Sequence, residues 1–258
     1  MKRIIAFALL LNAALLGVIA WQLVTDNHNA NHQAYAADKD EILKHMSIVE
    51  LPIDDKGGKA KTIRFSGVNV QVVNGAGKTE ELNSLGNLVV GYQETRPSGN
   101  DRSGSHNLVV GGWNNYSIWG GQVVGWHNTI SGPYSTVSGG SNNTASGDVS
   151  TVSGGIGNTA SGLHSTVSGG MENTASGTHD TVSGGQGNTA SGAASTVSGG
   201  RGNTASFLYS TVSGGQKNTA SSPFSTVSGG RGNTASTGWS TVSGGKGQTT
   251  DKIGQHIP

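Results

Sequence analysis

Residues 135–149 are Ser-Thr-Val-Ser-Gly-Gly-Ser-Asn-Asn-Thr-Ala-Ser-Gly-Asp-Val, and close copies of this 15-residue unit follow one another to Gly245. The phrase Thr-Val-Ser-Gly-Gly occurs eight times in this stretch at a constant spacing. A fixed short period is typical of proteins in which equivalent coils stack on one another. The sequence therefore predicts an all-β fold, a parallel β-solenoid whose regular coils span residues 135–248.

Each unit holds two short segments in which polar and apolar residues alternate, as they do along a β-strand. Thr136-Val137-Ser138 is the first segment, and Thr144-Ala145-Ser146 is the second. Glycines separate the segments, and glycine permits the positive φ angles of sharp turns. Each coil should therefore contain two strands and two turns, with every residue roughly 4.8 Å from its copy in the next coil.

The alternation directs one valine and one alanine of each coil to the interior and places an asparagine at a turn. The amides of equivalent asparagines are expected to hydrogen-bond along the stack, which is a structural role. The predicted inward columns are Val137, Val152, Val167, Val182, Val197, Val212, Val227 and Val242, together with Ala145, Ala160, Ala175, Ala190, Ala205, Ala220 and Ala235. The predicted asparagine column is Asn128, Asn143, Asn158, Asn173, Asn188, Asn203, Asn218 and Asn233.

One valine and one alanine give each coil a thin hydrophobic core. Ordering a chain costs conformational entropy at every residue, and so little buried apolar surface offsets only part of that cost. We therefore expect chains to associate side by side, as a homotrimer in the simplest case or as a filament.

The N-terminus has the features of a targeting segment. Lys2 and Arg3 precede an apolar run from Ile4 to Val24, and residues 34–36 are Ala-Tyr-Ala, which suits a signal peptidase. The apolar run is also long enough to cross a bilayer. Residues 1–36 are thus predicted to be a signal peptide or an N-terminal membrane anchor, and both alternatives place the remaining chain outside the cytoplasm.

The pattern indicates three further regions. Residues 37–61 are predicted to be a linker with a short helix that runs to Met46, and its stretch 54–61 is expected to be flexible. Residues 62–134 form irregular coils that cap the stack, with a loop leaving it at 93–105. Residues 249–258 form a C-terminal tail.

The composition fits a repeat fibre and excludes several other classes of protein. The chain has 258 residues with 43 glycines, 12% charged residues and a formal net charge of +1. This near-neutral balance argues against a nucleic-acid partner. There are no cysteines, so disulfides and thiolate metal sites are excluded. No cofactor is predicted.

The phrases Ser-Thr-Val-Ser-Gly-Gly and Asn-Thr-Ala-Ser-Gly, between about Asn107 and Thr250, resemble the head repeats of trimeric autotransporter adhesins, the YadA-type head. That resemblance implies a left-handed trimeric β-roll that attaches bacteria to host or matrix surfaces. The repeat here is slightly longer than the usual family repeat. Neither the heptad stalk nor the membrane barrel of that family is expected in this sequence.

One variable position of the repeat becomes aromatic towards the C-terminus, at Tyr209, Phe224 and Trp239. A row of exposed rings either packs against a neighbouring subunit or stacks on a sugar. The same position holds His164 and His179, which Asp180 follows. These three residues form either a weak divalent-metal site or a variable solvated turn, and we favour the turn because a further ligand is missing.

No motif indicates catalysis. Residues 73–79 end in Gly-Lys-Thr like a phosphate-binding loop, but Val72 replaces the first glycine and no helix-forming run comes after it. No histidine or aspartate recurs beside the repeated serines to activate them. We therefore predict a non-enzymatic surface or matrix fibre that binds a surface or a glycan. The alternative is an ice-binding solenoid, because the Thr-x-Ser segments resemble the threonine rows of insect antifreeze proteins.

Overall fold

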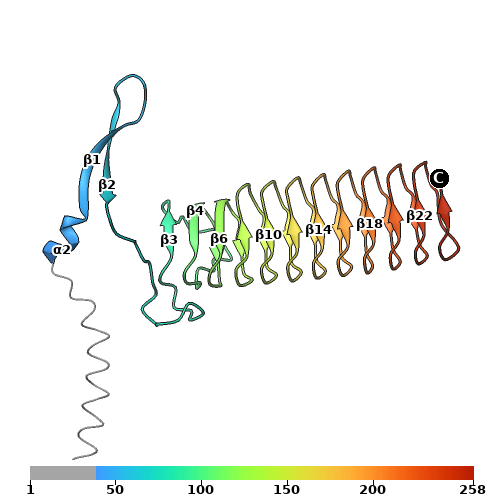
Figure 1. Cartoon of the computed structure of the whole chain (residues 1–258), viewed down its shortest axis with the longest axis horizontal. Helices are drawn as coiled ribbons and strands as arrows, with labels where there is room; N and C mark the ends of the chain where they lie inside the picture. Colours follow the sequence, from blue (N-terminus) through green and yellow to red (C-terminus); the bar gives the residue numbers. More distant parts are fainter. Residues whose placement is uncertain (1–38) are drawn as a thin grey trace, which may run out of the picture. The chain divides into compact units, whose positions relative to one another are not determined.

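The computed structural model describes residues 39–258, which divide into two compact units on either side of the Gln71–Val72 bond (Figure 1). The targeting segment predicted at 1–36 lies outside the described residues. Within residues 39–258, no helix is long and apolar enough to cross a lipid bilayer.

The N-terminal unit contains the helix α2 (Lys39–Lys44) and a hairpin of β1 (Met46–Pro52) and β2 (Lys59–Phe65). The two strands pair antiparallel, with Met46 opposite Phe65. This differs from the expected linker, because the helix ends before Met46 and stretch 54–61 forms a turn and part of β2. The turn is closed by Asp54, whose Oδ1 accepts hydrogen bonds from the backbone N–H groups of Lys56 and Gly58.

The second unit, residues 72–258, is a parallel β-solenoid built from two sheets, as the repeat predicted. The twelve strands of the first sheet, the valine sheet, are β3 (Leu88–Val90), β4 (Leu108–Gly112), β6 (Gln122–Trp126), β8 (Thr136–Val137), β10 (Thr151–Val152), β12 (Thr166–Val167), β14 (Thr181–Val182), β16 (Thr196–Val197), β18 (Thr211–Val212), β20 (Thr226–Val227), β22 (Thr241–Val242) and β23 (His256–Ile257). The nine strands of the second sheet, the alanine sheet, are β5 (Asn115–Tyr116), β7 (Thr129–Ile130), β9 (Thr144–Ala145), β11 (Thr159–Ala160), β13 (Thr174–Ala175), β15 (Thr189–Ala190), β17 (Thr204–Ala205), β19 (Thr219–Ala220) and β21 (Thr234–Ala235).

Equivalent residues of successive regular coils lie directly beside one another. Thr151 pairs with Thr166 and Val152 with Val167, and every regular coil repeats this shift of one unit. Figure 1 shows the result as a row of short parallel arrows running from β3 to the C-terminus. The strands are two residues long because glycines and turns interrupt them on both sides. A two-residue strand has little stability alone, so its stability comes from the copies on either side.

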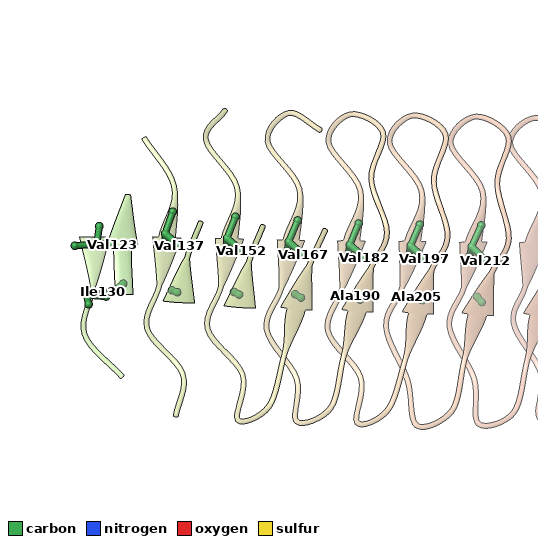
Figure 2. Close-up of a cluster of buried hydrophobic side chains, with 14 of the residues drawn as sticks. Val123, Ile130, Val137, Val152, Val167, Val182, Ala190, Val197, Ala205 and Val212 are labelled. Carbon is green, nitrogen blue, oxygen red and sulfur yellow. The ribbon is translucent and has the colours of Figure 1, made fainter. Parts of the chain in front are cut away.

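The core consists of one valine and one alanine per regular coil. All fifteen predicted inward residues, Val137 to Val242 and Ala145 to Ala235, have no solvent-exposed surface. Figure 2 shows the valines as a file along one wall, with the alanines in a second file beneath them. Bulkier residues extend the core into the first coils, where Val109, Tyr116, Val123 and Ile130 are buried. The apolar side chains buried in each regular coil are therefore small.

The asparagine column is fully buried and is held differently from the prediction. The amides were expected to bond to one another, but each bonds to the backbone. Asn188 Oδ1 accepts the backbone N–H of Asn203 at 2.9 Å, and Asn188 Nδ2 donates to the carbonyls of Gly184 and Gly200 at 2.8 and 3.0 Å. The same three bonds recur along the column, because the glycine turns leave backbone groups that need partners.

The first coils are shorter than the regular ones. Asn115 pairs with Thr129, a shift of fourteen residues, whereas Thr129 pairs with Thr144, a shift of fifteen. The loop at 93–105 was expected to leave the stack, but it packs onto these coils. Arg96 holds it there by donating hydrogen bonds to the carbonyls of Trp113 and Asn128 at 2.6 and 2.7 Å. The Asn128 carbonyl also accepts the backbone N–H of Asn115 at 2.9 Å, so Arg96 adds a side-chain hydrogen bond to the backbone ladder of the first coils.

Candidate interaction surface

The two turns of every coil lie at opposite edges of the solenoid. Edge A is the turn that follows each alanine-sheet strand, and edge B is the turn that follows each valine-sheet strand. Each turn has a position, equivalent from coil to coil, at which the residue adopts the left-handed backbone conformation, and these positions define one column at each edge; the edge B turn also has a second positive-φ position, which is always glycine, as at Gly215. The edge A column is Tyr134, Val149, His164, His179, Ala194, Tyr209, Phe224 and Trp239. The edge B column is Asn142, Gly157, Glu172, Gly187, Gly202, Lys217, Gly232 and Gly247.

The two columns adopt the same left-handed backbone conformation with different residue types. At edge B, five of the eight positions are glycine, the residue for which positive φ carries no steric penalty. At edge A none is glycine, and the φ angles are 52 to 60°. Positive φ costs a residue with a side chain about 1–2 kcal/mol, and a β-branched residue such as Val149 more than most. Side chains are therefore present at edge A in spite of the backbone cost, which marks this edge as a functional candidate.

The predicted ring row lies on edge A at the C-terminal end. The rings of Tyr209 and Phe224 stack with centroids 5.2 Å apart, and those of Phe224 and Trp239 with centroids 5.4 Å apart. Exposed fractions are 52% for Tyr209, 43% for Phe224 and 64% for Trp239. Phe207 and Leu208, which immediately precede Tyr209, are also exposed. Edge A thus carries an apolar ridge that is open to solvent in the single chain.

The two histidines of edge A stack on each other, and the aspartate that follows them points elsewhere. The rings of His164 and His179 are 5.0 Å apart and nearly parallel. The Asp180 side chain is buried and accepts hydrogen bonds from Ser195 N at 2.8 Å, Ser195 Oγ at 2.9 Å and Gly177 N at 2.6 Å. Across residues 39–258, no three histidine or acidic side chains gather closely enough to hold a metal ion. The Asp180 carboxylate is thus bound by Ser195 and Gly177 and does not join the two histidines.

Asp180 takes the place of the serine that occupies this position in the neighbouring coils. Burial raises the pKa of its carboxyl, and the hydrogen bonds from Ser195 and Gly177 oppose that effect without cancelling it. The aspartate is thus a local departure from the repeat, held inside the stack.

The loop that resembles a phosphate-binding loop has a structural arrangement. Asn74 organises it by accepting the Ala76 N–H at 2.9 Å and donating to the Glu81 carbonyl at 2.7 Å. Lys78 is exposed, and no helix comes after it in the described chain, where α2 is the sole helix. Without a helix N-terminus the loop lacks the N–H donors and the dipole that a helix terminus supplies to a phosphate.

The hydroxyl rows lie outside the core on both sheets. The threonines of the repeat are half-buried and in register, as in the pairs Thr151–Thr166 and Thr159–Thr174. The serines that follow the core valines, such as Ser153 and Ser198, are exposed. The solenoid therefore presents regular hydroxyl rows on both faces.

The ring row was predictable from the sequence, but the left-handed backbone beneath it was missed. The signal was present in the repeat, because the left-handed position of edge B is often glycine and that of edge A is never glycine within the eight coils. The loop contacts of Arg96 were also missed, since they depend on a fold-back that no local pattern reveals. Neither protein-family models nor curated protein sequences match the chain, so a function has to be inferred from its residues and geometry.

Proposed function

We propose that this protein is an exported, non-enzymatic β-solenoid that self-associates along edge A and serves as a structural or adhesive fibre. In the simplest case the assembly is a homotrimer, and attachment to a surface or matrix uses the repeat faces that remain open. The observation that carries the proposal is the solvent-exposed ring row of Tyr209, Phe224 and Trp239 on a left-handed backbone.

Burial of this row against another chain accounts for its composition. Aromatic side chains contribute strongly to interfaces, because each buries a large area with few rotatable bonds. Phe207 and Leu208 widen the same patch. A neighbouring subunit also adds buried apolar surface to coils whose own core is one valine and one alanine.

Export and attachment are supported by sequence features. Residues 1–36 have the pattern of a signal peptide or an N-terminal membrane anchor, so membrane contact would involve only this segment. The repeat phrase resembles the heads of trimeric autotransporter adhesins, a class of surface-attachment proteins whose heads are left-handed trimers. The shorter first coils, with their fourteen-residue shift, add to this likeness.

Sedimentation of the full chain tests the proposal. The wild-type protein should sediment as an oligomer, and replacing Tyr209, Phe224 and Trp239 together by alanine should shift it towards the monomer. The matched control replaces Ile156 and Met171, exposed apolar residues of edge B, and should leave the assembly unchanged. A stable, folded wild-type monomer would refute self-association. Unchanged assembly with lost binding to glycan would instead assign the rings to a ligand.

A second candidate function is ice binding, which the in-register threonine rows on both sheets favour. An ice-binding face typically carries Thr-x-Thr segments, whereas the second residue of each segment here is serine. Only the first residue of each segment therefore has the methyl group that such a face presents. A thermal-hysteresis measurement on the purified protein decides this candidate. A freezing-point depression well above that of an equal concentration of a non-binding protein would support it.

A further inference from the structure

The Lys and Arg residues of the regular stack all lie at one edge. Residues 135–250 contain four of them, Arg201, Lys217, Arg231 and Lys246, and each belongs to edge B. Arg201, Arg231 and Lys246 occupy one position of the turn, and Lys217 occupies the next position of the intervening coil. Backbone bridges join Arg201 to Gln216, Gln216 to Arg231 and Arg231 to Lys246.

These bridges place one positive charge in each of four consecutive coils. With neighbouring strands roughly 4.8 Å apart, the charges form a row about 14 Å long in which Lys217 is offset by one residue. All four residues are exposed. None of them forms an ion pair within the described part of the chain, whose salt bridges all lie in the N-terminal unit.

Acidic residues are separated from this basic row along the stack. Residues 135–200 contain Asp148, Glu172 and Asp180 and no Lys or Arg, whereas residues 201–250 contain the four cations and no Asp or Glu. Of the three acids, Asp180 is buried and only Glu172 lies at edge B. The separation of acidic and basic residues along the stack is not apparent from the chain's net charge of +1. The regular coils of a second copy, residues 135–248, offer no matching row of acids, so the basic row is not complementary to the repeat stack itself.

We propose that the basic row of edge B binds a linear acidic polysaccharide with about one carboxylate or sulfate per sugar. A row with one cation about every 4.8 Å matches a polymer whose charges are spaced by single sugar units. Arginine guanidinium groups pair with carboxylate and sulfate through two parallel hydrogen bonds. The exposed serines Ser198, Ser213, Ser228 and Ser243 precede the same turns and supply hydroxyl partners for sugar hydroxyls.

Charge density favours this ligand over duplex nucleic acid. Duplex DNA carries one charge per roughly 1.7 Å of its axis, so a single row with the spacing of edge B would neutralise only a minority of the phosphates that it spans. The row also lacks aromatic rings for stacking unpaired bases, because the rings of these coils lie on edge A.

This inference rests on the attachment role proposed above and specifies its ligand. The two edges separate the functions, because self-association uses the rings of edge A and leaves the cations of edge B open. A chain that assembles but does not bind the polyanion would refute only the ligand, while a bound monomer would refute only the assembly.

The test measures binding of the full chain to polygalacturonate at low ionic strength, with fully methyl-esterified polygalacturonate as the neutral probe. Wild-type protein should bind the acidic polymer and not the ester. Replacing all four cations by glutamine should weaken binding about tenfold or more, since each exposed ion pair contributes modestly but the four act on one polymer. Glutamine already occupies the position of Arg201, Arg231 and Lys246 at Gln186 and Gln216, and the Lys217 position holds the long polar side chain of Glu172 in another coil, so the variant should fold, which circular dichroism checks.

A matched control removes the same charge elsewhere, by replacing Lys56, Lys61, Arg64 and Lys78 with glutamine, and should bind like wild type. A second variant, Arg201→Lys with Arg231→Lys, should retain most of the binding because it keeps the charges. The logarithm of the binding constant should fall linearly with the logarithm of salt concentration, and the steepness of that slope should not exceed about 3 for four contacts. Unchanged binding in the glutamine variant, or equal binding to the ester, would overturn the proposal.

Two further probes examine the other polyanions. Oligo(dT) and vesicles of phosphatidylglycerol with phosphatidylcholine should bind more weakly than polygalacturonate at equal ionic strength. Stronger binding to either one, reduced by the same four substitutions, would overturn the polysaccharide and assign the row to single-stranded nucleic acid or to anionic lipid.

Discussion

Adjacent glycines at edge B differ in what a methyl group would meet, and this difference gives a sharp prediction. A Cβ at Gly215 would lie 2.2 Å from the carbonyl oxygen of Gly230 and 2.5 Å from Nδ2 of Asn218, and the backbone φ of Gly215 is +85°. A Cβ at Gly214 would meet nothing within 4 Å, and its φ lies outside the left-handed region. Gly215→Ala should therefore destabilise the stack, and Gly214→Ala should not.

The loss of unfolding free energy expected for Gly215→Ala follows from the hydrogen bonds that the added methyl group would break. The Gly230 carbonyl accepts from Gln216 N at 2.9 Å and from Asn218 Nδ2 at 3.0 Å, and relieving a 2.2 Å contact displaces this carbonyl from both donors. Two lost hydrogen bonds at about 1 kcal/mol each, with about 1 kcal/mol for positive φ, give about 3 kcal/mol for Gly215→Ala. Gly214→Ala should change the free energy of unfolding by less than about 0.5 kcal/mol or stabilise slightly.

Chemical denaturation of the two variants, with amide hydrogen exchange of the flanking coils, measures this difference. Exchange should accelerate in the coils next to residue 215 in one variant and stay unchanged in the other. Equal stability of the two variants would refute the close stacking of glycine turns along edge B.

Three other predictions concern the core and the buried polar groups. Val197→Ala should cost about 2 kcal/mol of unfolding free energy in denaturation because the valine is fully buried, whereas Ser198→Ala on the surface of the same coil should cost under about 0.5 kcal/mol. Asn203→Ala removes the partners of the Asn218 N–H and the Gly199 carbonyl and one of the two hydrogen bonds to the Gly215 carbonyl, which still accepts from Arg201 N, so it should cost about 3 kcal/mol, far more than the same truncation of Gln216. Because burial raises the pKa of the Asp180 carboxyl, folding favours its protonated form; its contribution is fully present below the ordinary aspartate pKa of about 3.9 and is lost as pH rises through the higher folded value. Asp180→Ser should therefore raise the melting temperature at pH 7 more than at pH 3, and an equal effect at both would contradict the buried carboxyl.

The repeat made the solenoid predictable because periodicity reports stacking directly. Once Val137 and Val152 are equivalent, their burial and their parallel pairing are consequences of the alternation around them. The hairpin of β1 and β2 was not predicted, because it occurs once and depends on a turn closed by the Asp54 side chain. The prediction for the loop at 93–105 was also wrong, since the long-range bonds of Arg96 have no local signature.

The candidate surface was predictable in composition but not in geometry. The rings of Tyr209, Phe224 and Trp239 were apparent as a variable position that becomes aromatic, yet their stacking and their left-handed backbone required coordinates. The cations of edge B went unnoticed because Lys217 is offset by one residue from Arg201 in the repeat. Only the turn geometry brings both residues to one edge.

The distance between equivalent positions along the solenoid tests the in-register stack most directly. Spin labels on cysteines replacing the exposed serines Ser153 and Ser213, four coils apart, should lie roughly 19 Å apart, from about 4.8 Å per coil. Moving the second label to Ser228 and then to Ser243 should add about 4.8 Å each time. Distances by double electron–electron resonance that grow linearly with coil number would support the in-register stack. Distances that do not increase in this regular way would contradict it, and with it both proposed edges.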